Sequence, residues 1–480
     1  MSSVKVLKFG GSSVADGERI DSVCAIIAEA AREGRAAVVL SAMKGITDRL
    51  ITAARAAEQG SDTFRQILES IRATHFDAVR ALFPPADQAA VLTPLALMCN
   101  ELEEILHGVE LIRECSPRTL DLVMSFGERL SCTLAAAYMR SKGMNAVVVD
   151  AREMILTNDR FGSAAVNFPE SYKRIRERLA AVRGIPVIPG FIGATEGGVT
   201  TTLGRNGSDY TASIIGAGAD AEVIEIWTDV DGVLSADPRI VPDAFVIPRM
   251  SYEEAMELSY FGAKVIHPYS MVPAVERNIP LLIKNSLNPA APGTLIAGGA
   301  QGHEHNGSRE SRQHPITGIA SITGISLVNI EGGGMMGIPG FAARIFSALA
   351  REGVNIIMIS QASSEHTICL VFRTEEGERA LAALNHELAP ELSAHRIERF
   401  QLLRDLLVVS VIGENMAGTP GIAGRLFSAL GKAQVNVLVI AQGSSERNIS
   451  LVIEEKDHAL AVRTIHAAFL SSHLSAAAGV

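Results

Sequence analysis

The chain has 480 residues, 48% of them hydrophobic, and a formal net charge of -10 at pH 7. At roughly 150 residues per domain, this length predicts about three domains whose cores fold without metals or disulfides. The acidic balance disfavours a nucleic acid or an anionic membrane as the main partner. Five cysteines without ligand spacing disfavour a disulfide framework. The lack of a signal-peptide pattern and of a membrane-length apolar run predicts a cytoplasmic protein.

The N-terminal segment has the pattern of a strand, a glycine turn and a helix. Residues 4–9 are mostly apolar, Gly10 and Gly11 follow, and a helical pattern begins after Asp16. The arrangement suits a phosphate, although its spacing is neither that of a Walker A loop nor G-x-G-x-x-G. Lys8, at the strand end, either reaches a transferring phosphoryl group or extends into solvent as a surface lysine.

The next two segments carry polar groups in similar places. A strand predicted at 37–41 ends in Ser41, and Thr47 follows in a glycine-containing loop. Open α/β sheets bind ligands at such carboxyl strand ends. A helical region then covers 49–142 with breaks near 83–85 and 116–117.

Glu128 lies on an otherwise apolar part of that helical region. A partly buried carboxylate needs a cationic partner. Both the α-amino group of a ligand and an arginine such as Arg129 satisfy this need, so the two interpretations stay open.

Further strands are predicted at 146–150, 186–191, 222–228 and 280–285, separated by helices or hairpins. Such alternation is typical of a doubly wound sheet. We therefore expect an α/β fold with ligand groups at one edge of the sheet.

The segment 202–210 is the strongest candidate for the chemistry. Gly204 and Gly207 flank Arg205, and a helical pattern begins at Ser208 and Asp209. Backbone N–H groups at a helix start and the forked Arg205 donor favour an anionic ligand. The alternative is a capped turn with a solvated arginine.

Charged residues also follow the strand at 222–228. Thr228 and Asp229 end it, and Arg239 and Lys264 lie further along the chain. Strand-end acids can hold a metal-bound nucleotide or a ribose, and Arg239 a phosphate. Taken alone, the Thr-Asp pair is more typical of a strand-end turn.

Together these segments closely resemble the aspartate kinase branch of the amino acid kinase family. The motifs that match, in the family's order, are 8–14, Ser41 with 45–47, 127–128, 202–210, 227–230, 237–239 and 261–265. The resemblance implies the amino acid kinase fold, a mostly parallel sheet sandwiched by helices. Ser12 and Asp48 replace the family's common Thr and Asn, and each keeps a polar group.

The resemblance implies transfer of the γ-phosphoryl group of ATP to the β-carboxylate of L-aspartate. In that reading Glu128 takes the α-amino group and Arg205 clamps a carboxylate of the substrate. The remaining substrate-binding residues are Ser41, Thr47 and Ser208.

The resemblance also assigns a catalytic pair and a nucleotide site. Lys8 stabilises the transferring phosphoryl group, and Asp209 orients the reacting groups. ATP and Mg2+ are the expected cofactors, with Mg2+ bridging phosphate oxygens and no protein ligand assigned to it. The residues expected to contact the nucleotide are Lys8, Gly10, Gly11, Thr228, Asp229, Arg239 and Lys264.

The kinase domain is expected to span 1–296, and a glycine-rich, polar linker to span 297–314. His303 and His305 in this linker are interpreted as solvated rather than metal-binding. Beyond it, the pattern of 337–365 returns at 418–446. The C-terminal part is therefore two copies of one α/β module.

Each copy resembles an ACT domain of ferredoxin-like fold, expected at 315–396 and 397–480. Whether the chain end belongs to the first domain stays open. Effector contacts are expected at equivalent positions of the two copies, which are Gly340, Asn355, Gln361, Gly421, Asn436 and Gln442.

The Gln-x-Ser-Ser-Glu turns at 361–365 and 442–446 resemble those of the threonine-sensitive branch, which includes the kinase half of bifunctional aspartate kinase–homoserine dehydrogenases. Threonine is the expected feedback inhibitor, with lysine the alternative. ACT pairing predicts a homodimer or homotetramer. Because the chain stops soon after the second copy, we expect a monofunctional enzyme. Another carboxylate or carbamate kinase, and an amino acid sensor with an inactive kinase half, are the competing functions.

Overall fold

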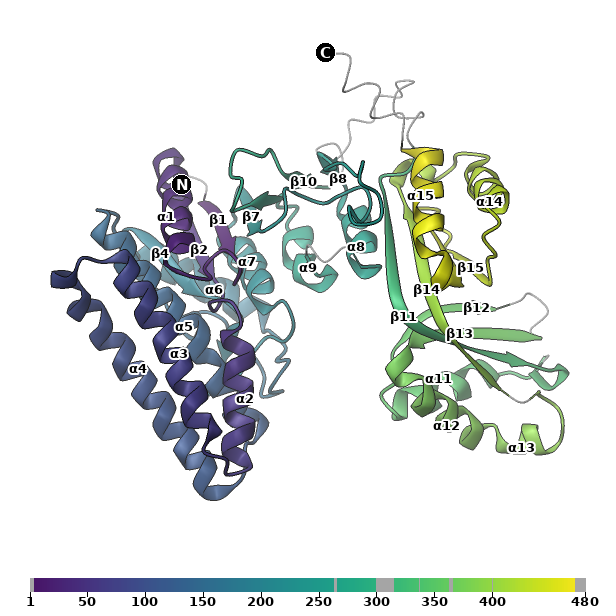
Figure 1. Ribbon diagram of the computed structural model, residues 1–480, viewed down its shortest axis with the longest axis horizontal. Coiled ribbons are helices and arrows are strands. Elements are labelled where there is room, and N and C mark those ends of the chain that lie inside the picture. Colours follow the sequence, from purple (N-terminus) through teal and green to yellow (C-terminus); the bar gives the residue numbers. More distant parts are fainter. Residues whose placement is uncertain are drawn as a thin grey trace, which may run out of the picture. The chain divides into compact units, whose positions relative to one another are not determined.

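The computed structural model describes residues 4–262, 266–298, 315–335, 337–361, 366–398 and 400–470. These residues form two compact units (Figure 1). The first unit comprises 4–233, 246–252 and 266–298. The second comprises 234–245, 253–262 and the described residues from 315 onward. Two segments that precede position 297 therefore belong to the second unit.

Among the described residues, the first unit is built on a sheet of eight strands in the order β3-β4-β2-β1-β7-β9-β10-β8. Its neighbouring strands are parallel except for β9 and β10. The strands are β1 (Val4–Phe9), β2 (Arg35–Leu40), β3 (Ala146–Val148), β4 (Ile185–Pro189), β7 (Val223–Thr228), β8 (Arg249–Met250), β9 (Leu281–Asn285) and β10 (Thr294–Ile296), and a separate hairpin contains β5 (Ile192–Ala194) and β6 (Thr200–Thr202). The predicted α/β fold with a mostly parallel sheet is confirmed. The strands β5, β6, β8 and β10 were not predicted, because each has only two or three residues and such a short segment shows no periodic pattern.

Helices cover both faces of this sheet. They are α1 (Gly17–Glu33), α2 (Ile46–Glu58), α3 (Thr63–Leu82), α4 (Pro85–Ile112), α5 (Pro117–Ser141), α6 (Phe168–Ala181), α7 (Gly207–Gly218) and α9 (Pro268–Glu276). Leu7 and Phe9 of β1 pack in one core with α1 to α5. On the other face α7 contacts β1, β2 and β7, and α6 and α9 flank it. Strands buried on both faces explain the near-continuous apolar runs in the sequence.

The predicted helix breaks near 83–85 and 116–117 are confirmed, because α4 and α5 each begin with a proline, Pro85 and Pro117. One break was missed, between α2 and α3. There Gly60 has a φ of +69°, and the guanidinium of Arg113 donates to the carbonyl of Gln59 at 2.6 Å. This side chain comes from a distant position in the sequence, so local pattern could not show it.

The second unit contains α8 (Tyr252–Tyr260), of which residues 253–260 belong to it, and a six-stranded antiparallel sheet in the order β12-β13-β11-β14-β16-β15. The repeat seen in the sequence appears in the structure as two copies of a similar order of strands and helices. The first copy is β11 (Gly318–Glu331), α11 (Phe341–Arg351), β12 (Ile356–Gln361), β13 (Thr367–Arg373), α12 (Gly377–Glu387) and α13 (Ala389–Ser393); the second is β14 (Gln401–Ile412), α14 (Ile422–Lys432), β15 (Val439–Gln442), β16 (Asn448–Glu454) and α15 (His458–Phe469). The helices α12 and α15 follow the last strand of each copy.

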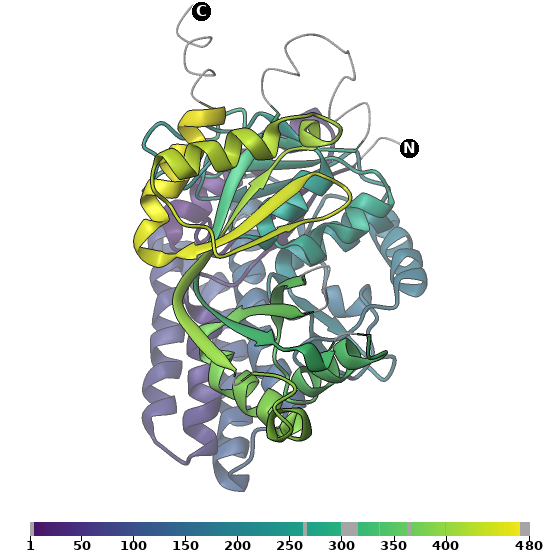
Figure 2. The same cartoon turned by 90° about the vertical axis from the view of Figure 1, so that its right-hand side faces the viewer.

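The two copies share their long strands β11 and β14, and their helix pairs lie at opposite ends of these strands (Figures 1 and 2). One core lies under α11 and α12 and includes Val328 and Phe400. The other lies under α14 and α15 and includes Ile319 from the start of β11. Residues 316–319 therefore complete the second core, together with α15, the last element described.

Residues 234–245 also contribute to this second core. Ala236 and Val241 are buried in it, and the hydroxyl of Ser235 lies 3.2 Å from Nε2 of His466. The second unit thus incorporates a segment that directly follows the turn after β7.

Candidate active site

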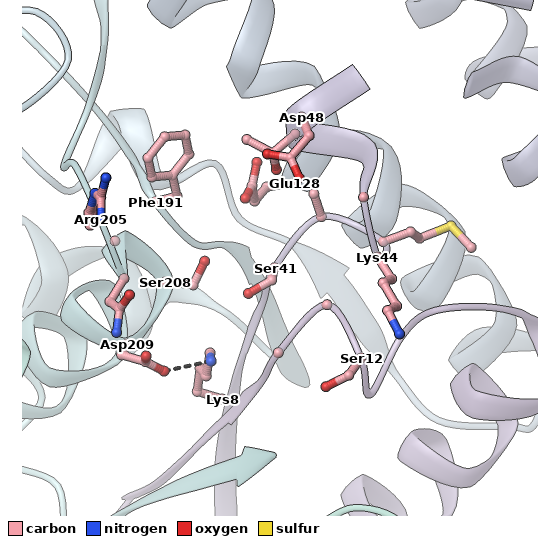
Figure 3. A pocket seen from close by; sticks show the side chains of 18 of the residues that line it. Lys8, Ser12, Ser41, Lys44, Asp48, Glu128, Phe191, Arg205, Ser208 and Asp209 are labelled. Atoms are coloured by element: carbon pink, nitrogen blue, oxygen red, sulfur yellow. Dashed lines mark ion pairs between the residues drawn. The ribbon is translucent and has the colours of Figure 1, made fainter. Parts of the chain in front are cut away.

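A cavity of about 520 Å³ lies in the first unit, where the ends of β1 and β2 approach the start of α7 (Figure 3). It collects groups from segments that are far apart in the sequence. The predicted site residues that line it are Lys8, Gly10, Gly11, Ser41, Thr47, Glu128, Arg205, Ser208, Asp209 and Thr228.

Lys8 and Asp209 form a buried ion pair in this cavity. Lys8 Nζ lies 2.5 Å from Asp209 Oδ1 (Figure 3), and neither residue exposes more than 8% of its surface. Asp209 lies in the first turn of α7, where the helix dipole favours a negative charge. A buried ion pair contributes little net stability. In this cavity the pair lies where it can contact a bound ligand.

The cavity depends on close packing of three backbone segments. A Cβ on Gly11 would lie 2.9 Å from the carbonyl oxygen of Ala42, and a Cβ on Gly127 would lie 2.8 Å from the Ala42 methyl group. The loop after β2 is thus held between the turn after β1 and helix α5. Glycine at these two positions is what allows Glu128 to approach the loop that carries Ser41 and leads into Thr47 at the start of α2.

Glu128 is a buried carboxylate on α5, and its Oε2 has no hydrogen-bond partner among the described residues. Burial raises the pKa of Glu128 to about 8, and hydrogen bonds from the backbone oppose the shift. Arg129 instead pairs with Glu101 at 3.5 Å and stacks on the ring of Phe126. Arg129, the partner that the sequence suggested within the chain, is therefore engaged elsewhere, and Glu128 lines the cavity without it.

The turn before α7 places Arg205 on the opposite wall of the cavity (Figure 3). Gly204 and Asn206 have φ values of +80° and +55°, and Arg205 between them is exposed. Ser208 follows in the first turn of α7 and is buried. An exposed guanidinium beside a helix N-terminus suits an anionic group such as a carboxylate.

Several lining residues were not predicted as site residues. Lys44 and Phe191 line the cavity, as do Ser12 and Asp48, which stand where the family commonly has Thr and Asn. Phe191 has a φ of +68°, unusual for a bulky residue. Its N–H donates to the Thr211 hydroxyl at 2.9 Å. Such a strained backbone depends on tertiary contacts, so the sequence offered no signal for it.

Three predicted nucleotide contacts are not among the cavity residues. Asp229 accepts a hydrogen bond from the Thr228 hydroxyl at 3.2 Å, beside the cavity wall. Arg239 belongs to the second unit, where it pairs with Asp237 at 2.6 Å. Lys264 lies outside the described residues, as do His303 and His305 of the linker.

The predicted effector residues occupy equivalent positions in the two copies. Gly340 and Gly421 precede α11 and α14 with φ values of +85° and +91°. Asn355 and Asn436 are exposed before β12 and β15, and the exposed Gln361 and Gln442 end these strands. The repeat therefore presents the same polar groups twice.

No group of three or more His, Cys, Asp or Glu side chains suited to a metal ion occurs in the part of the chain that the structure describes. Over the same residues, no helix combines the length and apolar character needed to span a membrane.

Comparison with known families agrees with this architecture. A model of the amino acid kinase family matches residues 3–285, and a model of the ACT domain matches residues 328–388 and 409–469. The ACT matches coincide with the two repeats.

Similar proteins carry aspartokinase names. A bifunctional aspartokinase/homoserine dehydrogenase of Haemophilus influenzae is 38% identical over 98% of this chain, which spans 57% of that relative. The chain spans about half the length of the similar bifunctional proteins of Arabidopsis thaliana. Chloroplastic aspartokinase 1 of A. thaliana is 35% identical, with 97% of this chain and 80% of the relative covered.

Solved structures of E. coli aspartokinase III are also similar. The complex with aspartate and ADP has a TM-score of 0.80 and 28% identity, covering 98% of this chain and 100% of that one. The complex with lysine and aspartate has a TM-score of 0.78 and 29% identity, with the same coverage.

Proposed function

The chain belongs to the amino acid kinase family, with two ACT domains after the kinase, and on that premise we propose that it is an ATP-dependent aspartate kinase. The reaction would give 4-phospho-L-aspartate and ADP. Names of similar proteins and the aspartate and ADP bound to E. coli aspartokinase III support this proposal.

The observation that carries the proposal is the unpartnered carboxylate oxygen of Glu128 in the cavity wall. A buried polar atom without a hydrogen bond costs free energy, on the order of 1–3 kcal/mol. The α-ammonium group of an amino acid would remove that cost. Arg205 on another wall offers a complementary partner for a carboxylate of the same ligand.

The chemistry requires positioning and charge neutralisation more than proton transfer. A β-carboxylate with a pKa near 3.9 is already ionised at neutral pH, so no general base is needed. One of its oxygens attacks the γ-phosphorus as the bond to the bridging oxygen of ADP breaks. Lys8 would stabilise charge on the transferring group, and Asp209, at 2.5 Å, would hold the Lys8 ammonium in place.

The nucleotide is proposed to lie along Gly10, Gly11 and Thr228. Mg2+ would enter with ATP, since it is usually held by phosphate oxygens and water with few carboxylates. It would neutralise phosphate charge, and we assign no protein ligand to it. Contacts from Asp229, Arg239 and Lys264 remain predictions.

Regulation through the ACT copies is proposed with threonine as the effector and lysine as the alternative. The paired Gln361 and Gln442 positions support threonine, whereas E. coli aspartokinase III has been crystallised with lysine. Replacing Gln361 with alanine should weaken threonine inhibition, with Gln401→Ala, another exposed glutamine on a strand, as the control. Unchanged threonine inhibition in Gln361→Ala would count against this assignment.

We also propose that ACT sheets pair between copies of the chain and that the protein is cytoplasmic.

The test is ADP formation by the full chain with Mg-ATP and L-aspartate, with hydroxylamine added to trap the acyl phosphate. We expect ADP and aspartyl hydroxamate in equal amounts. N-acetyl-L-aspartate, which lacks the ammonium group, should give neither. Nucleotide binding without turnover would refute the proposal and favour an amino acid sensor with an inactive kinase half. Repeating the assay with threonine and with lysine identifies the effector.

A further inference from the structure

We propose that Asp121, which does not line the cavity, positions the Arg205 turn for amino acid binding. The inference rests on the proposed function. It makes Asp121 a positioning residue that acts through Arg205, not a catalytic one.

Asp121 is a buried carboxylate on α5 that binds two chain segments at once. Its Oδ2 accepts from the N–H of Thr202 at 2.8 Å, and its Oδ1 from the Thr202 hydroxyl at 2.9 Å. The N–H of Gly162 lies 3.1 Å from Oδ1 and 3.0 Å from Oδ2. Asp121 exposes 1% of its surface.

This carboxylate is satisfied by backbone and hydroxyl donors alone. No ion pair joins it to a basic side chain within the described ranges. Burial raises the pKa of Asp121, and the donors from Gly162 and Thr202 oppose the shift. Burying a carboxylate costs free energy. We therefore expect the Asp121 carboxylate to hold the Gly162 and Thr202 segments in positions that a neutral side chain would hold less well.

The geometry that Asp121 fixes joins two walls of the active site. Glu128 follows Asp121 by seven residues on α5, so both side chains lie on the same side of that helix. Thr202 ends β6 and precedes Arg205 by three residues. Thr202 O also accepts from the N–H of Ala164 at 2.9 Å. Asp121 therefore ties the helix that carries Glu128 to the strand that leads into the Arg205 turn.

The first test is Asp121→Asn, which keeps the size but turns an NH2 group toward N–H donors. We expect the KM for aspartate to rise about tenfold or more, because small displacements of binding groups have effects of this size. The KM for ATP should change less than about twofold, because the proposed nucleotide contacts Gly10, Gly11 and Thr228 lie after β1 and at the end of β7, not on the segment that Asp121 binds. Equal changes in both constants would overturn the inference.

A double-mutant cycle separates positioning from a loss of stability. If Asp121 acts through Arg205, adding Asp121→Asn to Arg205→Ala should raise the KM for aspartate no further. The matched control is Ser171→Ala, because the buried Ser171 hydroxyl also anchors backbone, at the N–H of Leu156 (3.0 Å), but does not line the cavity. It should lower Tm without changing either KM. Additive effects of Asp121→Asn and Arg205→Ala would overturn the inference.

Thr202→Val and Thr202→Ser keep the test decisive if Asp121→Asn does not fold. The valine variant removes the hydroxyl donor and should raise the KM for aspartate severalfold, and the serine variant should restore it. If the wild type is active and both Asp121→Asn and Thr202→Val have the wild-type KM for aspartate, this inference is overturned and the proposed function is not. A folded wild-type chain without aspartate-dependent turnover overturns the proposed function and this inference together.

Discussion

The raised pKa of Glu128 predicts a specific pH dependence of aspartate binding. With a pKa of about 8 in the empty cavity, most of this carboxyl is protonated at pH 7. Only the ionised form pairs with a substrate ammonium group. Binding of aspartate should therefore require loss of a proton from Glu128.

The size of the change in the KM for aspartate follows from the fraction of Glu128 that is ionised. About one-tenth of Glu128 is ionised one pH unit below its pKa and about half at the pKa, and the apparent affinity is reduced by that fraction. The KM for aspartate should fall about fivefold between pH 7 and 8 and about fiftyfold between pH 6 and 8. The KM for ATP should not follow the same curve.

The assay is initial-rate ADP formation at saturating Mg-ATP from pH 6 to 8.5, with calorimetry in buffers of different ionisation enthalpy to detect the released proton. Glu128→Gln is the control, because its neutral amide should bind aspartate weakly at every pH. A wild-type KM for aspartate that stays flat over this range would refute the link between Glu128 and the ammonium group.

Three further outcomes are expected. Lys8→Ala and Asp209→Ala should each lower kcat about 10²- to 10³-fold in the ADP assay, and wild-type turnover in both would contradict the catalytic assignment. Gly11→Ala should destabilise the chain by about 1–3 kcal/mol in thermal melts, because its Cβ would meet the Ala42 carbonyl at 2.9 Å. Gly108→Ala on α4, with no atom within 4 Å of the new Cβ, should be neutral or stabilising; equal losses would refute the packing argument. Because the pKa of Glu128 is raised from about 4.5 in the unfolded chain to about 8 in the folded chain, the free energy of unfolding should fall by about 1.4 kcal/mol per pH unit as the pH rises between these values. The Tm of Glu128→Gln relative to that of the wild type should therefore be higher at pH 8 than at pH 5. The same Tm difference at both pH values would contradict the burial effect.

The sequence predicted those parts of the fold that local pattern encodes. Apolar runs marked the long strands, and Pro85 and Pro117 marked helix starts. Polar residues at strand ends predicted the site because parallel strands bring their carboxyl ends to one edge. Lys8 and Asp209, far apart in the chain, accordingly meet in one cavity.

What the sequence could not show depends on contacts between distant segments. The strained backbone of Phe191 and the three donors around Asp121 have no local signature. The partner of Glu128 could not be chosen from the sequence either, because Arg129 is adjacent in the chain but pairs with Glu101. The roles of the lining residues and of the effector positions remain predictions.

The burial of residues 234–245 in the second core has a consequence during protein synthesis. Ala236 and Val241 leave the ribosome long before most of their core partners, which apart from Ile316 and Ile319 lie at Leu407 and beyond. At about 5–20 residues per second, the intervening stretch of roughly 160 residues takes on the order of 10–30 s to make. Throughout that interval Ala236 and Val241 lack most of the core that buries them, and we expect chaperones to bind this segment of the nascent chain. The first unit thus carries, within its own stretch of sequence, a segment whose core is completed only after the rest of the second unit has been synthesised.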